Sequence, residues 1–119
     1  MLRRLSSVLD LVDRKKLGLI IILIIMYLAV YYNHTWMHEN AHKRIAEEYG
    51  LKGEIHMNYF FGNSYTAIIN SKEEELSVEE LQQMRMLHAQ NEIVGYNVDN
   101  LILAVFMIPL FMILMRRND

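Results

Sequence analysis

The chain has 119 residues, which is room for one small domain, and it contains no cysteine. Disulfides and thiolate metal ligands are therefore excluded. The net charge of −2 says little about partners, and the basic residues form no stripe that would suggest a nucleic-acid partner. Hydrophobic residues make up 53% of the chain and gather mostly in two nearly uncharged blocks, which bracket a polar stretch that holds most of the acidic residues.

Residues 1–16 are predicted to form an amphipathic helix at the cytoplasmic face of a membrane. Apolar residues recur there at helical spacing, at Leu2, Leu5, Val8, Leu9 and Val12. Such a helix lies on the membrane surface with its basic side chains toward the lipid headgroups. A signal peptide is the alternative, because a basic segment precedes an apolar run. No small-residue cleavage site follows Val30, so we expect the segment to remain in the mature protein.

The block from Leu17 to Tyr32 is apolar all round, whereas a buried helix of a soluble protein normally keeps some polar face. Tyr31, Tyr32 and Trp36 extend the block as an interfacial aromatic belt. With this extension the segment reaches the ~20 residues that cross a bilayer. The sequence therefore predicts a first transmembrane helix over residues 17–36.

A second apolar block runs from Leu101 to Met115. Extended toward the N-terminus to residue 98, this block predicts a second transmembrane helix over residues 98–115. A short cytoplasmic tail follows at 116–119. Pro109 lies inside this block, and membrane helices tolerate an internal proline.

Positive charges stand at the outer ends of both blocks. Arg14, Lys15 and Lys16 precede the first block, and Arg116 and Arg117 follow the second. The positive-inside rule then predicts an integral membrane protein with both termini in the cytoplasm and residues 37–97 on the exoplasmic side. The composition of the middle agrees, since the stretch from His38 to Asn97 contains five basic and ten acidic residues.

A candidate metal motif follows the first apolar block. His38-Glu39-Asn40-Ala41-His42 fits the pattern His-Glu-x-x-His. On a helix His38 and His42 are four residues apart and share a face, so both imidazoles can reach one metal ion while Glu39 lies beside it.

The stretch around this motif predicts a small α+β cap. The first helix should continue past the motif and stop at Gly50, which readily takes the left-handed conformation. Two strand-like runs, 54–60 and 65–69, are separated by turn residues and predict a β-hairpin. The capping box at 77–80 starts a second helix near Val78 that should run directly into the second apolar block. The predicted fold class is thus a mainly α membrane protein, a two-transmembrane helical hairpin with an exoplasmic α+β cap.

An open zinc site has three protein ligands, so a third is expected on the second helix. The midpoint of the two motif histidines lies eight residues beyond Tyr32, or about 12 Å along a helix. Glu92 lies nine residues before Leu101, or about 13.5 Å. In an antiparallel hairpin the two heights match, which favours Glu92. His88 and Asp99 lie near the face of Glu92 and could orient a ligand or replace it.

The motif resembles that of the zincin metallopeptidases, in which the two histidines bind zinc and the glutamate activates the metal-bound water. In the gluzincin branch the third ligand is a Glu on a downstream helix, and Asn91-Glu92 looks like that residue. The branch commonly has an Asp three residues later, where this chain has Gly95. Intramembrane site-2 proteases also resemble the chain, because they join the motif to a transmembrane helix and use an Asp ligand, which would favour Asp99. Their motif lies within the membrane, whereas this one follows the aromatic belt.

The resemblance implies a Zn²⁺ ion held by His38, His42 and Glu92, with Glu39 as the general base. An anionic intermediate needs a further hydrogen-bond donor. The candidates for this donor are Tyr96, His88 and His56. The strand pair could bind an extended peptide at its edge, as zincin sheets do.

These features predict a membrane-anchored zinc metallopeptidase that hydrolyses a peptide or membrane-protein substrate at the exoplasmic surface of the lipid bilayer, as a homo-oligomer or in a membrane complex. The alternative is a non-enzymatic small membrane subunit or regulator of a larger complex. In that case His34, His38 and His42 are interfacial polar groups, or the motif holds a structural metal. A pore-forming hairpin is a third hypothesis, although the apolar blocks lack the polar stripe of a pore.

Overall fold

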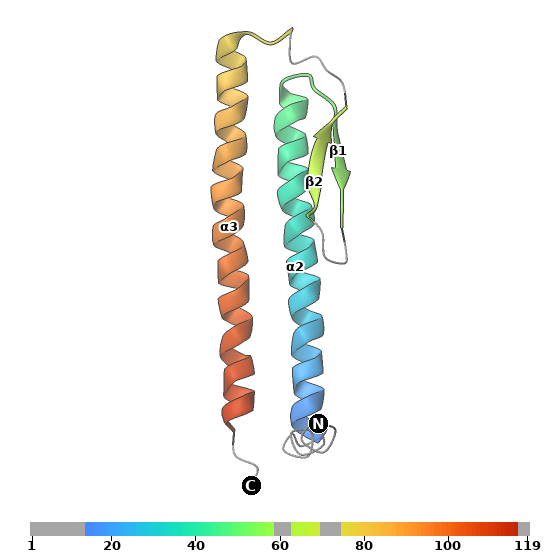
Figure 1. Ribbon diagram of the computed structural model, residues 1–119, viewed down its shortest axis with the longest axis vertical. Coiled ribbons are helices and arrows are strands. Elements are labelled where there is room, and N and C mark those ends of the chain that lie inside the picture. The colour runs from blue at the N-terminus through green and yellow to red at the C-terminus, as the bar shows by residue number, and fades with distance from the viewer. Residues whose placement is uncertain (1–13, 59–62, 70–74, 117–119) are drawn as a thin grey trace, which may run out of the picture. The chain divides into compact units, whose positions relative to one another are not determined.

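The computed structural model of the chain is mainly helical, and it describes residues 14–58, 63–69 and 75–116. Along the chain, a strand pair follows one long helix and precedes another: α2 (Arg14–Glu48), β1 (Gly53–His56), β2 (Tyr65–Ile68) and α3 (Val78–Met115) (Figure 1). The predicted combination of two long apolar helices with a small β-hairpin between them is confirmed. Most of the helix predicted over residues 1–16 falls outside the described residues, and its last three residues belong to α2.

Helix α2 ends as the sequence predicts, at a glycine in the left-handed conformation. Gly50 has a φ of 75°, and the Leu51 and Gly50 amides donate to the carbonyls of Ala46 and Glu47 at 3.0 Å each. This is the Schellman arrangement, which satisfies carbonyls at the end of a helix. Its characteristic apolar contact is also present, since Leu51 packs against Ala46.

Helix α3 begins at the predicted capping box. The Ser77 amide donates to the Glu80 carboxylate at 2.8 Å, and the Glu80 amide donates to the Ser77 hydroxyl at 3.2 Å. The Ser77 amide and the Ser77 hydroxyl each lie 2.8 Å from the Glu80 carboxylate, and hydrogen bonds from both lower the pKa of Glu80. The helix then continues without a break through Pro109 to Met115, so the predicted direct run into the second apolar block is confirmed.

The hairpin is antiparallel, with Gly53 opposite Ile68 and His56 opposite Tyr65. Strand β1 is shorter than predicted, because it ends at His56 and only part of the predicted remainder is described. Figure 1 shows the strand pair beside the C-terminal part of α2. Thr66 of β2 ties the two together through a 2.8 Å hydrogen bond from its hydroxyl to the Glu39 carbonyl.

The chain divides into two units, to which both helices contribute. The polar unit is Tyr31–Asn100, and its small buried core consists of Ala46, Leu51 and Met84. This core packs the C-terminal end of α2 against the start of α3. It thereby fixes the register in which the polar side chains of the two helices meet.

The apolar unit is Met1–Val30 together with Leu101–Asp119. Within it, the rings of Tyr27 and Phe106 meet edge to face with centroids 5.5 Å apart, and Lys16 donates a hydrogen bond to the Arg116 carbonyl. Most of its described apolar side chains are exposed. Both helices are long and apolar enough to cross a membrane by length and composition.

Candidate metal centre

Three side chains in the polar unit converge on one point, and they are the three that the sequence favours as metal ligands. Nε2 of His42 lies 3.2 Å from Nε2 of His38 and 2.9 Å from Oε1 of Glu92. The third side of this triangle, from His38 Nε2 to Glu92 Oε1, is 3.7 Å. The group could therefore hold a metal ion with one atom from each residue.

The size of the triangle fits a small divalent cation. A tetrahedral zinc ion with bonds of about 2.0–2.1 Å keeps its ligand atoms about 3.3 Å apart. The observed separations of 2.9, 3.2 and 3.7 Å lie on both sides of that value. Without a cation, these contacts require a proton on Nε2 of His38 or of His42.

His88 supports the group from the far side of His42. Its Nδ1 lies 2.7 Å from Nδ1 of His42, and the two rings stack with centroids 4.9 Å apart. Burial lowers the pKa of His88, the neighbouring His42 lowers it further, and Glu92 acts in the opposite direction. Neutral His88 can accept the Nδ1 proton of His42, which leaves the His42 Nε2 lone pair free for a metal. His88 thus stands where an orienting residue was expected.

Asn91 holds the backbone behind His38. Its Nδ2 donates to the His38 carbonyl at 3.2 Å and lies 3.5 Å from the Nδ1 of the same residue. Asn91 and Glu92 therefore act on the two motif histidines from adjacent positions of α3. The sequence analysis pointed to the Asn91-Glu92 pair. The hydrogen bond from the Asn91 side-chain amide to His38 depends on how the two helices pack.

Glu39 is buried, with 6% of its surface exposed. The Thr66 hydroxyl lies 2.8 Å from the Glu39 carboxylate and 2.8 Å from its carbonyl, so its single proton serves one of the two at a time. This contact fixes a motif carboxylate against strand β2. The sequence analysis did not identify Thr66, because it lies far from Glu39 along the chain and no local pattern predicts their contact.

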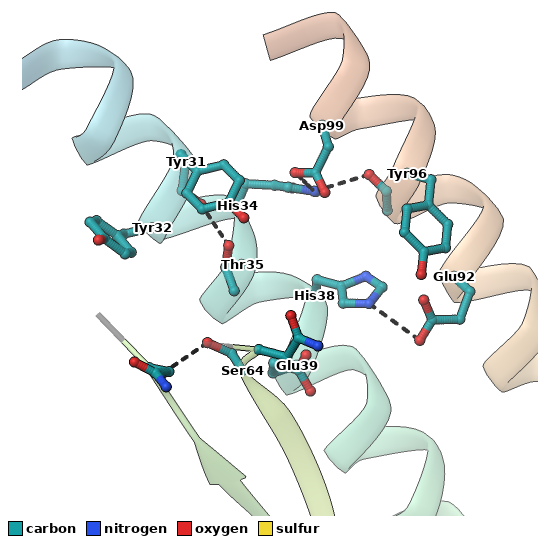
Figure 2. A pocket seen from close by; sticks show the side chains of 13 residues that line it. Tyr31, Tyr32, His34, Thr35, His38, Glu39, Ser64, Glu92, Tyr96 and Asp99 are labelled. Carbon is teal, nitrogen blue, oxygen red and sulfur yellow. Dashed lines mark hydrogen bonds and ion pairs between the residues drawn. The ribbon is translucent and has the colours of Figure 1, made fainter. Parts of the chain in front are cut away.

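Two cavities adjoin the ligand group. One, of about 330 Å³, is lined by His38, Glu39 and Glu92 together with the Asn63-Ser64 segment before β2. Figure 2 shows His34 and His38 of α2 facing Glu92, Tyr96 and Asp99 of α3, with Glu39 and Ser64 beside them. The second cavity, of about 300 Å³, is lined by Glu39, His42, His88 and Glu92 and by residues of β2. Glu39 borders both cavities.

The remaining candidate residues lie outside the ligand group. Asp99 lies beside His34, with Oδ1 3.4 Å from His34 Nε2, as Figure 2 also shows. Tyr96 lines the larger cavity but is mostly exposed. His56 stacks on Tyr65 within the hairpin, with ring centroids 4.9 Å apart.

Comparisons with protein-family models, with curated proteins and with solved structures give no match for this chain. Function has to be argued from the residues of the site.

Proposed function

We propose that the chain is a membrane-anchored zinc metallopeptidase. The observation that carries the proposal is the convergence of His38, His42 and Glu92 on one point while the buried Glu39 borders the same cavities. A structural metal site requires ligands alone. A buried carboxylate next to them is what hydrolysis requires in addition.

Zinc is the metal that this ligand set favours. Two imidazoles and one carboxylate suit zinc, whereas calcium and magnesium prefer all-oxygen ligands. The absence of cysteine and the three-ligand count are typical of an open site rather than a closed structural one. A zinc ion at this position would polarise a substrate carbonyl and lower the pKa of a bound water.

Glu39 is the proton carrier in this proposal. Its carboxylate takes a proton from the attacking water and passes it to the leaving amine. The Thr66 hydroxyl, 2.8 Å from the carboxylate, holds it in position. Burial of Glu39 keeps bulk water from competing for the same proton.

The edge of β2 that faces away from β1 offers a binding surface for an extended peptide. The Ile69 amide donates to the Lys52 carbonyl at 2.9 Å, and these residues are opposite each other in the register of the hairpin. Hydrogen-bonded and non-hydrogen-bonded pairs alternate in an antiparallel sheet. The backbone groups of Thr66 and Ile68 therefore point away from β1. Both residues line the cavity that contains His42 and Glu92, so a strand added at this edge would pass the ligand group.

The membrane assignment rests on the apolar unit. None of the most apolar windows of α2 and α3 is buried, unlike the core helix of a soluble protein. A contiguous apolar surface of this size needs lipid or a partner to cover it. The basic residues Lys15, Lys16 and Arg116 at the ends of the spans favour cytoplasmic termini, with the peptidase site on the exoplasmic side.

The test compares Glu39→Gln with the wild type after zinc loading of the detergent-purified protein. We expect about one zinc per chain in both proteins, since Gln is nearly isosteric with Glu and Glu39 is not a ligand. Cleavage of a mixed peptide library, read by mass spectrometry, should fall about 10²–10⁴-fold in the variant. Glu48→Gln, at an exposed position of the same helix, is the matched control and should keep full activity. Wild-type cleavage rates in Glu39→Gln would rule out this mechanism.

A second candidate function is a structural metal clasp in a non-enzymatic membrane subunit. The small size of the buried core of the polar unit favours it, because Ala46, Leu51 and Met84 alone form that core among the described residues. A metal that joins α2 to α3 would stabilise so small a core. This candidate predicts zinc in both the wild type and Glu39→Gln, a large fall in stability on chelation, and no peptide cleavage by either protein.

A further inference from the structure

Gly95 of α3 lies directly against the imidazole ring of His38. A Cβ atom built on Gly95 would be 2.4 Å from Nδ1 and 2.5 Å from Cε1 of that ring. Real side chains do not approach this closely, so any residue larger than glycine must displace the ring. Gly95 is itself buried.

The backbone gives no reason for a glycine at this position. Gly95 lies inside α3, and the positive φ that favours glycine is found among the described residues at Gly50. Alanine is the better residue for the interior of a helix. The missing side chain of Gly95 leaves space for the His38 ring, and this space accounts for the glycine.

We propose that Gly95 is a positioning residue of the metal centre, whose missing side chain forms the niche that holds the His38 ring. This inference rests on the metal site proposed above. Three residues of one stretch of α3 act on His38 together: Asn91 bonds its carbonyl, Glu92 faces its Nε2 at 3.7 Å, and Gly95 makes room for its ring. A ring pushed out of the niche carries Nε2 away from the His42 Nε2 atom, which now lies 3.2 Å from it.

The test is Gly95→Ala, with Gly18→Ala as the matched control. Gly18 is also helical, and a Cβ there meets no atom within 4 Å. We expect Gly95→Ala to bind cobalt(II) and zinc about 10–100-fold more weakly than the wild type, the effect of losing the support of a ligand. Gly18→Ala should bind both metals as the wild type does.

A metal-free measurement examines the ring itself. Diethyl pyrocarbonate modifies accessible imidazoles, and His56, which is exposed, serves as the internal reference. Peptide mapping of the metal-free proteins should show faster modification of His38 in Gly95→Ala and an unchanged rate at His56. In a His38→Ala background the added methyl group meets no ring, so Gly95→Ala should there raise the thermal midpoint through helix propensity.

The outcomes separate this inference from the proposed function. If the wild type binds metal and Gly95→Ala binds it equally well, the positioning role of Gly95 is refuted and the proposed metal centre is retained. If the wild type binds no metal, the metal centre fails, and with it the positioning role. An unchanged rate of His38 modification in Gly95→Ala would refute the positioning role of Gly95, whatever the metal affinities of the two proteins. A fall in thermal midpoint that persists in the His38→Ala background would also overturn it, because the strain would then lie elsewhere.

Discussion

The two units use the same pair of helices in opposite ways. In the apolar unit, α2 and α3 meet through apolar side chains such as the edge-to-face rings of Tyr27 and Phe106. In the polar unit, they meet largely through imidazole, amide and carboxylate groups, among them His38, His42 and Glu92. These side chains are only partly buried, and burying a polar group is costly unless it finds a partner. Their contacts with one another supply such partners, whereas the other unit holds mostly exposed apolar side chains of two helices long and apolar enough to cross a membrane.

The largest effect should follow from removing a ligand in the polar unit. His38→Ala and Glu92→Ala each leave only two protein ligands, so we expect the bound zinc to be lost in both, with metal affinity reduced well over 100-fold, beyond the effect of an outer-shell change. Metal content by plasma mass spectrometry measures this directly. Asp99→Ala is the control and should retain zinc, because Asp99 contacts His34 rather than the ligand group. Zinc that is kept in Glu92→Ala but lost in Asp99→Ala would move the third ligand to Asp99.

A lysine introduced into each unit should affect membrane association differently in the two units. Ile25 of the apolar unit and Met86 of the polar unit are similarly exposed, at 61% and 55%. Lysine at position 25 would lie in the hydrocarbon core, where it costs about 2.5–3.5 kcal/mol, whereas lysine at position 86 stays in water. We therefore expect Ile25→Lys to reduce the fraction of protein that resists alkaline extraction from membranes, and Met86→Lys to leave it unchanged. An equal response of both variants would contradict a lipid-facing apolar unit.

The smallest effect should be a pH dependence within the polar unit. The pKa of His88 is lowered from 6.5 in the folded protein by burial and by His42. Below pH 6.5 the unfolded chain thus binds more protons at this residue than the folded chain, so the contribution of His88 to stability is present above pH 6.5 and is lost as pH falls toward the folded pKa. The thermal midpoint of the metal-free protein should fall on acidification, and less steeply in His88→Gln. Parallel profiles of the two proteins would show that His88 does not contribute.

Local signals predicted the helix ends and the shared face of the two motif histidines. Gly50 and the Ser77–Glu80 capping box act within one turn of chain, so their structure follows from the residues themselves. The spacing of His38 and His42 likewise places both on one face of any helix that contains them. The contact of Thr66 with Glu39 joins residues far apart in the chain, and no local pattern predicts such a pairing.

The sequence by itself determined two apolar helices, the strand pair between them and a histidine pair able to share a metal. It favoured Glu92 as the partner on α3 by its height along the helix, with His88 and Asp99 as alternatives, because all three lie near one face of a helix and periodicity alone cannot rank them. The tertiary structure decided this point. Packing of Ala46, Leu51 and Met84 fixes how far α3 is displaced along α2 within the polar unit, and that displacement brings Glu92 to the histidine pair and Asp99 to His34. The same displacement sets Gly95 against the His38 ring, so the reason for a glycine there exists only in the folded protein.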